Sequence, residues 1–155
     1  MKRFLRGFVD AGRGLWTCLR EERNFRIHLC AAAYALGFAP AMALSRGEWA
    51  ALLLTIALVI GMEAVNTAIE RAVDLASSDR HPLARAAKDA AAGAVLFCAV
   101  AAVGVGVALF GKPAAWIALW GRLIASPWKL SLLVLSLPAA FGLIVLGGCG
   151  QRKEP

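Results

Sequence analysis

Residues 49–74 have the sequence WAALLLTIALVIGMEAVNTAIERAVD, in which an uncharged run ends at Met62 and a polar stretch begins at Glu63. We expect one helix here, starting near Glu48, continuing well beyond the apolar run and ending at about Leu75. Its first part has the composition of a membrane span, and its second part carries ionisable groups. This combination decides both the fold class and the place to look for chemistry.

Three further stretches without charge cover residues 29–45, 90–111 and 130–151. The 155-residue chain is 60% hydrophobic and 17% charged, whereas soluble domains are about 45–50% apolar and about 25% charged. Apolar runs of roughly 20 residues match the ~30 Å hydrocarbon core of a bilayer. The sequence therefore predicts an all-α integral membrane bundle with four spans, the third beginning with Pro82 in its first turn.

The charges predict the orientation of the spans. Net charge is +7, and seven of the seventeen Lys and Arg residues lie between Lys2 and Arg26. Since Lys and Arg concentrate in cytoplasmic loops, the N-terminus and the 75–89 connection are expected inside, and residues 112–129 outside. Residues 1–26 mix basic and aromatic side chains, which is typical of an amphipathic helix lying on the membrane; a packed cytoplasmic helix is the alternative. Such a basic segment beside membrane spans favours anionic lipid over nucleic acid as a partner.

The chain divides near residue 111. The third helix is rich in alanine after Pro82, and small residues let membrane helices or subunits approach closely. From Lys112 the pattern changes, because Trp116, Trp120 and Trp128 with Arg122 are typical of an interfacial helix. A further span, residues 130–148, follows. We therefore separate residues 1–111 from an extension, residues 112–155, that consists of an interfacial helix and an additional C-terminal transmembrane helix.

The polar stretch places its acids on one side of the helix. At about 100° per residue, Glu63, Asn66, Glu70 and Asp74 share a face about 80° wide. With ~1.5 Å rise per residue, Glu63 lies about 21 Å beyond Trp49, within a ~30 Å core, whereas Asp74 reaches water. An acid inside the membrane is costly and indicates function.

A second polar cluster follows, Asp79-Arg80-His81 and then Lys88-Asp89. Carboxylates that can hold Mg²⁺ thus accompany cations that can neutralise phosphates, as phosphoryl transfer requires. The acids also span the depth between a lipid hydroxyl and an aqueous nucleotide, which favours a lipid kinase. The alternative is structural, with the acids paired to Arg71, Arg85 and Lys88 to lock the helices together. The chain has no G-x-x-x-x-G-K-[ST] loop, so an ATP site must be of another kind.

These residues resemble the bacterial diacylglycerol kinase and undecaprenol kinase family. The family pattern is Glu-x-x-Asn-[Ser/Thr]-Ala-Ile-Glu-x-x-x-Asp, then a short loop with His, then Ala-Lys-Asp and a helix of small residues. The chain matches it with Glu63, Asn66, Thr67, Ala68, Ile69, Glu70, Asp74, His81, Ala87, Lys88 and Asp89. The resemblance covers roughly residues 2–110 and identifies residues 1–111 as a lipid kinase membrane domain. Family members commonly end after three spans, so the resemblance does not explain residues 112–155.

The resemblance implies a role for each matched position. Glu63 is expected to be the catalytic base that accepts the proton of the lipid hydroxyl, with Asn66 and Asp74 in positioning or support. Glu22 and Glu70 are expected to hold the metal, Mg²⁺. The expected contacts to ATP are Arg3, Glu22, Glu70, Asp79, Arg80, His81, Lys88 and Asp89.

The resemblance also implies a homotrimer with sites shared between subunits, in the bacterial inner membrane, with the active site facing the cytoplasm. The acceptor is expected to be undecaprenol or diacylglycerol, and the segments 22–28 and 81–84 are closer to the undecaprenol kinase branch. His28 is interpreted as an interfacial or hydrogen-bonded histidine rather than a ligand.

Two functions of other classes compete with the kinase. An ion- or proton-coupled transporter also uses buried acids, but it predicts polar groups deep in several spans, and here the acids gather near one surface. A membrane subunit without activity is the other alternative, and it predicts that no lipid alcohol is phosphorylated.

Overall fold

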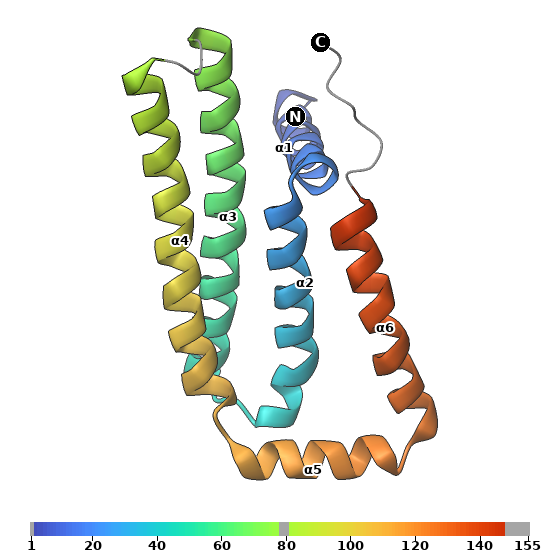
Figure 1. The fold of residues 1–155 in the computed structure, drawn as a ribbon. Coiled ribbons are helices and arrows are strands. Elements are labelled where there is room, and N and C mark those ends of the chain that lie inside the picture. Colours follow the sequence, from blue (N-terminus) through green and yellow to red (C-terminus); the bar gives the residue numbers. More distant parts are fainter. Residues whose placement is uncertain (1, 78–80, 148–155) are drawn as a thin grey trace.

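The computed structural model describes residues 2–77 and 81–147, and these ranges consist of helices and short connections (Figure 1). The predicted all-α architecture is confirmed. In chain order the elements are α1 (Lys2–Glu21), α2 (Arg23–Phe38), the short 3₁₀ helix η1 (Ala39–Met42), α3 (Arg46–Ala76), α4 (Pro82–Phe110), α5 (Pro113–Ile124) and α6 (Pro127–Leu146).

Four segments are long and apolar enough to cross a membrane, as predicted. They are Arg23–Met42, Arg46–Ala76, Pro82–Phe110 and Pro127–Leu146. Large hydrophobic side chains remain exposed along them, among them Leu58 on α3 and Phe97 on α4. A soluble protein of this size rarely exposes so much contiguous apolar surface, so these faces are suited to lipid.

The boundary between α1 and α2 differs from the prediction. Residues 1–26 were expected to form the surface helix, but Glu22 adopts an extended conformation (φ −99°, ψ 115°) and α2 begins at Arg23. The surface helix is therefore shorter, and Arg26 belongs to the first span. Phe4, Phe8 and Trp16 on α1 are exposed, which agrees with a helix that lies on the membrane.

Local caps fix the ends of α3 and α4. The Ser45 hydroxyl accepts a hydrogen bond from the Glu48 backbone N–H (3.3 Å), and the Glu48 carboxylate accepts one from the Ser45 N–H (2.7 Å). This reciprocal pair is a capping box. At the start of α4, Nδ1 of His81 accepts from the Leu83 N–H (3.3 Å), and Pro82 occupies the first turn.

Helices α3 and α4 form the most extensive helix pair and run antiparallel (Figure 1). Ala84, Ala91 and Val95 are buried on α4, so the small side chains allow the close contact that the alanine content predicted. At the α5 end of the bundle, Ala39, Leu52 and Leu109 form a packed apolar cluster. The opposite end, where α1 contacts α3, contains the polar residues of α3.

The extension folds back on the first span. Helix α5 crosses the end of the bundle and α6 returns beside α2 (Figure 1). Tyr34 of α2 and Ser136 of α6 are joined by a hydrogen bond (3.0 Å). Nζ of Lys112 donates to Glu48 (3.0 Å) and to the Met42 carbonyl (3.3 Å). Polar contacts thus attach the extension to the rest of the chain at two places, at Lys112 and in the middle of α6.

Candidate active site

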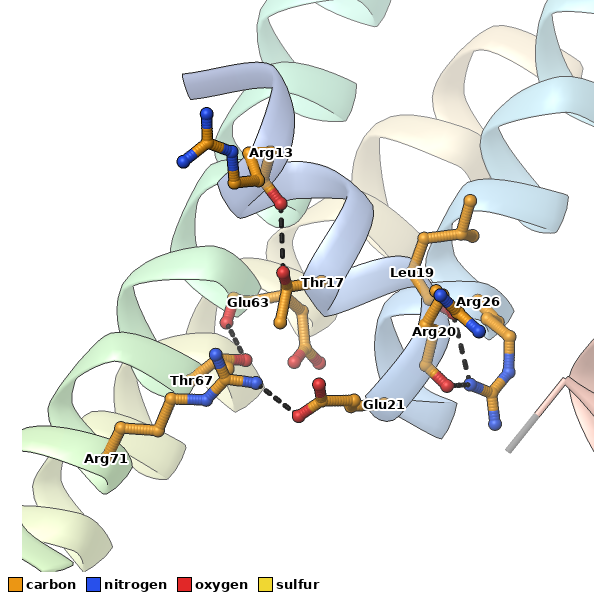
Figure 2. Close-up of polar contacts among 9 residues, drawn as sticks. All are labelled: Arg13, Thr17, Leu19, Arg20, Glu21, Arg26, Glu63, Thr67 and Arg71. Carbon is orange, nitrogen blue, oxygen red and sulfur yellow. Dashed lines mark hydrogen bonds and ion pairs between the residues drawn. The ribbon is translucent and has the colours of Figure 1, made fainter. Parts of the chain in front are cut away.

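The acids of α3 are graded in burial along the helix. Glu63 is 3% exposed, Asn66 and Glu70 are half-buried, and Asp74 is exposed. Thr67, also buried, donates from its hydroxyl to the Glu63 carbonyl (3.0 Å; Figure 2). The exposure of these side chains therefore increases along α3 from Glu63 to Asp74.

Glu63 has a histidine partner on the neighbouring span. Nε2 of His28 lies 3.2 Å from Oε1 of Glu63, and the two side chains are 24% and 4% exposed. A buried carboxylate is destabilised unless a hydrogen bond or a charge accompanies it, so His28 stabilises Glu63 where it stands. The sequence predicted an interfacial or hydrogen-bonded histidine, but it did not identify the partner or place His28 in the site.

Asn66 and Glu70 form a second polar pair one turn further along α3. Nδ2 of Asn66 donates to Oε1 of Glu70 (2.8 Å). The buried amide oxygen of Asn66 has no hydrogen-bond partner among the described residues. A buried acceptor without a partner is uncommon and indicates a place where a ligand, an ion or water can bind.

The end of α1 is held close to this face of α3. Arg71 donates to Glu21 (2.6 Å; Figure 2), an ion pair that the sequence did not predict. Glu22, which follows directly, is half-buried. Glu22 and Glu70 are close enough to Glu63 for their negative charges to act on it. The fold thus gathers three of the predicted site residues, Glu22, Glu63 and Glu70, from the α1–α2 junction and from α3.

The C-terminal end of α3 and the N-terminal end of α4 are joined by an ion pair between Lys88 and Asp74. Arg85 lies 3.9 Å from Asp89 on the exposed face of α4. The pair between Lys88 and Asp74 is one that we expected if the acids lock the helices together. Asp74 therefore helps to hold α3 and α4 together. His81 caps α4 and is exposed. Asp79, Arg80 and the side chain of Arg3 lie outside the described residues.

The side-chain oxygen atoms of this site are suitable ligands for a Mg²⁺ ion that substrate phosphates also bind. Mg²⁺ is usually bound by one or two carboxylates together with substrate phosphates. The Glu70 carboxylate and the unpaired amide oxygen of Asn66 supply such ligands, and Glu22 lies nearby. Within residues 2–77 and 81–147, no three or more His, Cys, Asp or Glu side chains are arranged to hold a metal by themselves.

An apolar groove of about 450 Å³ reaches this site from the α5 end of the bundle. It lies between α2, α3 and α4, and His28, the partner of Glu63, forms part of its wall. A hydrocarbon chain in this groove would bring the group at its end to His28 and Glu63. The site therefore combines an apolar approach with carboxylates that become progressively more exposed toward one surface.

Comparison with known proteins identifies the family. The prokaryotic diacylglycerol kinase family model matches residues 10–110. The undecaprenol kinase of Bacillus subtilis is 46% identical over 110 residues, which cover 71% of this chain and 89% of that protein. A diacylglycerol kinase of Synechocystis is 42% identical over 107 residues (68% and 61%), and one of Helicobacter pylori is 31% identical over 121 residues (78% and 84%).

No solved structure matches the chain significantly. The matched region nevertheless contains the described carboxylates of α3 and the residues of α4 that accompany them. The match to the family model ends at Phe110, before the extension begins. The chain therefore belongs to the prokaryotic diacylglycerol kinase family of lipid kinases.

Proposed function

We propose that this protein transfers the γ-phosphoryl group of ATP to the hydroxyl group of a membrane lipid alcohol, undecaprenol or diacylglycerol, in a Mg²⁺-dependent reaction. One observation carries the proposal: the buried carboxylate of Glu63 contacts a histidine that lines an apolar groove. A lipid alcohol in this groove places its hydroxyl beside a proton acceptor. The names of the curated relatives support the same activity.

In the proposed reaction Glu63 accepts the proton of the lipid hydroxyl. The lipid oxygen attacks the γ-phosphorus, the bond from that phosphorus to the β–γ bridging oxygen breaks, and ADP leaves. The products are ADP and a lipid phosphate. General base catalysis of this kind contributes about 10²- to 10⁴-fold to rate, and the remainder comes from positioning and charge neutralisation.

The polar residues beyond Glu63 are assigned to the nucleotide. Glu22 and Glu70, with the amide oxygen of Asn66, would hold Mg²⁺, which reduces the negative charge on the phosphates. Lys88 and Asp89, with His81, Asp79, Arg80 and Arg3, would contact ATP. Since Lys88 is paired with Asp74, we expect the triphosphate to share or replace that partner when it binds.

The acceptor and the assembly are part of the proposal. Undecaprenol is favoured because the segments 22–28 and 81–84 resemble that branch, and because a curated undecaprenol kinase is 46% identical. A homotrimer in the inner membrane, with the site at the cytoplasmic surface, is supported by the family resemblance and by the charge distribution. Ala86, Ala90 and Gly93 form an exposed face of small residues on α4, which suits contact with another subunit.

A competition assay tests the activity and identifies the acceptor. Purified protein is given labelled ATP, Mg²⁺ and equal amounts of undecaprenol and diacylglycerol in mixed micelles. We expect label in a lipid phosphate, predominantly undecaprenyl phosphate. If neither alcohol is labelled, the kinase proposal is wrong, and ion flux through proteoliposomes without ATP would instead indicate a transporter.

A further inference from the structure

The apolar groove ends on a tryptophan that lies beyond the residues matched by the family model. Its lining at the α5 end includes Phe38, Phe110 and Trp116. The first two belong to α2 and α4, but Trp116 belongs to α5 and therefore to the extension. The family match stops at residue 110. The extension thus contributes directly to a surface that leads to Glu63.

The groove offers little to a polar occupant. Its described lining is apolar apart from His28, Thr55 and the indole N–H of Trp116. The Thr55 hydroxyl already donates to the Ala51 carbonyl (2.7 Å), and the indole N–H donates to the Phe110 carbonyl (2.8 Å). Of these three side chains, only His28 contacts a residue of the candidate active site, Glu63. A hydrocarbon chain with a polar group at the His28 end fits this distribution.

The length of the groove matches a lipid tail. Leu52 of α3 lines its α5 end. Glu63 lies eleven positions further along the helix, which corresponds to about 16 Å at ~1.5 Å per residue. One leaflet contributes about half of the ~30 Å hydrocarbon core. A tail with its hydroxyl at Glu63 therefore meets Trp116 after roughly one leaflet's depth of chain.

Trp116 is held firmly at this end. Besides the hydrogen bond to Phe110, its ring packs edge-on against Phe38, with the centroids 5.5 Å apart. Helix α5 is itself attached through Lys112, which donates to Glu48 and to the Met42 carbonyl. Trp116 thus forms the floor of the groove at its α5 end. Because contacts to α2, α3, η1 and α4 hold it in place, it resists displacement by a longer chain.

We infer that Trp116 closes the tail groove and sets the length of acceptor chain that can be held straight with its hydroxyl at Glu63. The inference rests on the proposed kinase function and adds a specificity-determining residue to it. Chains that reach Trp116 fill the groove. Longer chains must bend out through its open side, and they gain no further contact inside it.

The experiment compares kcat/KM for lipid alcohols of increasing tail length in the full-length protein, with diacylglycerols and polyprenols as two series. Wild type should improve with length and then level off or decline. Trp116→Ala removes the floor and should raise kcat/KM for the longer tails on the order of tenfold. The tail length at which kcat/KM stops rising should therefore increase. Trp116→Phe retains bulk and should keep the wild-type profile. Trp120→Ala, an exposed tryptophan of the same helix, is the matched control and should leave the profile unchanged.

A second variant acts in the opposite direction. Gly106 lines the groove, and an added Cβ there meets no atom within 4 Å. Gly106→Leu favours the helix but fills the groove near Trp116, so it should lower kcat/KM for full-length tails on the order of tenfold and spare short ones. This variant keeps the test valid even if Trp116→Ala folds poorly.

The outcomes separate the two proposals. Wild-type protein that phosphorylates no lipid alcohol would refute the kinase function. Active protein whose length profile is the same in wild type, Trp116→Ala and Gly106→Leu would refute the floor alone. If Gly106→Leu changes the mass of the assembly and leaves the profile intact, the groove is occupied by a second copy of the chain, which also overturns the inference.

Discussion

Glu63 is a buried acid, and its carboxylate lies beside a histidine of the neighbouring span. A carboxylate within a membrane span is stabilised when a donor lies within hydrogen-bond distance. His28 supplies that donor from α2 at 3.2 Å. The same contact places the carboxylate beside His28, which lines the apolar groove. His28 is thus a positioning residue in the proposed mechanism, acting through Glu63.

Replacing His28 tests this role. His28→Ala leaves a buried carboxylate without its donor, a loss of about 1–3 kcal/mol, so kcat should fall about 5- to 150-fold while KM for ATP stays near wild type. His28→Gln places an amide N–H near the position of Nε2 and should recover most of the rate. Tyr34→Phe, on the same helix, serves as the control. Equal losses in the Ala and Gln variants, or a parallel change in the KM for ATP, would contradict the positioning role.

The sequence predicted the acids of α3 well and their partners poorly, for a physical reason. Glu63, Asn66, Glu70 and Asp74 share a face because helical periodicity alone sets their directions. Contacts between helices depend on how two spans are rotated and shifted against each other, which spacing does not define. The pairing of His28 with Glu63 and that of Arg71 with Glu21 therefore emerged only from the fold.

At the scale of elements, one arginine joins three helices. Arg26 of α2 is 3% exposed and donates to carbonyls at the C-terminal ends of two others: Leu19 (3.1 Å) and Arg20 (3.0 Å) of α1, and Ile144 (3.3 Å) of α6. A cation is favourable at helix C-termini, where the carbonyls lack helical partners. Arg26 therefore ties the surface helix and the extension to the first span.

A second contact ties α6 to α2 in the middle of the span. Ser136 donates its hydroxyl hydrogen to the Leu133 carbonyl (2.7 Å), so Tyr34 is the donor in the bond between Tyr34 and Ser136. Hydrogen bonds between membrane helices average about 0.6 kcal/mol. Tyr34→Phe and Ser136→Ala should each lower the free energy of unfolding by about that amount, and the double variant should cost little more than either. Additive losses in a double-mutant cycle would show that the two side chains do not interact.

Element positions were largely predictable, and their boundaries were less so. The apolar runs predicted all four spans, and Pro82 correctly marked the start of α4. The break at Glu22 was not predicted, because neither glycine nor proline interrupts the chain there. The packing of α6 against α2 also could not be predicted, since an apolar span has no sequence pattern that selects its neighbour.

For the whole molecule, the charge distribution predicts a defined orientation. The N-terminus and the α3–α4 connection should lie in the cytoplasm and α5 outside. Alkaline phosphatase, which is active only outside the inner membrane, should be active when fused after Leu119 and inactive when fused after Leu146 or Leu75. Activity in the reverse pattern would place the acids of α3 on the side without ATP.

The assembly is tested by mixing inactive subunits. If sites are shared between subunits, Glu63→Gln and Asp89→Asn chains co-expressed in one membrane should recover a measurable part of the activity, because some sites then draw both intact residues from different copies. Each variant expressed alone is the control. Mixed assemblies with no more activity than the single variants would show that each site is built within one subunit.

Turnover by Glu63→Gln tests whether Glu63 is the catalytic base. The substitution keeps the size of the side chain and removes the proton acceptor, so lipid phosphorylation should fall about 10²- to 10⁴-fold while the affinity for ATP with Mg²⁺ stays close to wild type. Asp10→Asn, which changes an exposed carboxylate 3.6 Å from Arg13 on α1, should retain full activity. Wild-type turnover in Glu63→Gln would contradict the account.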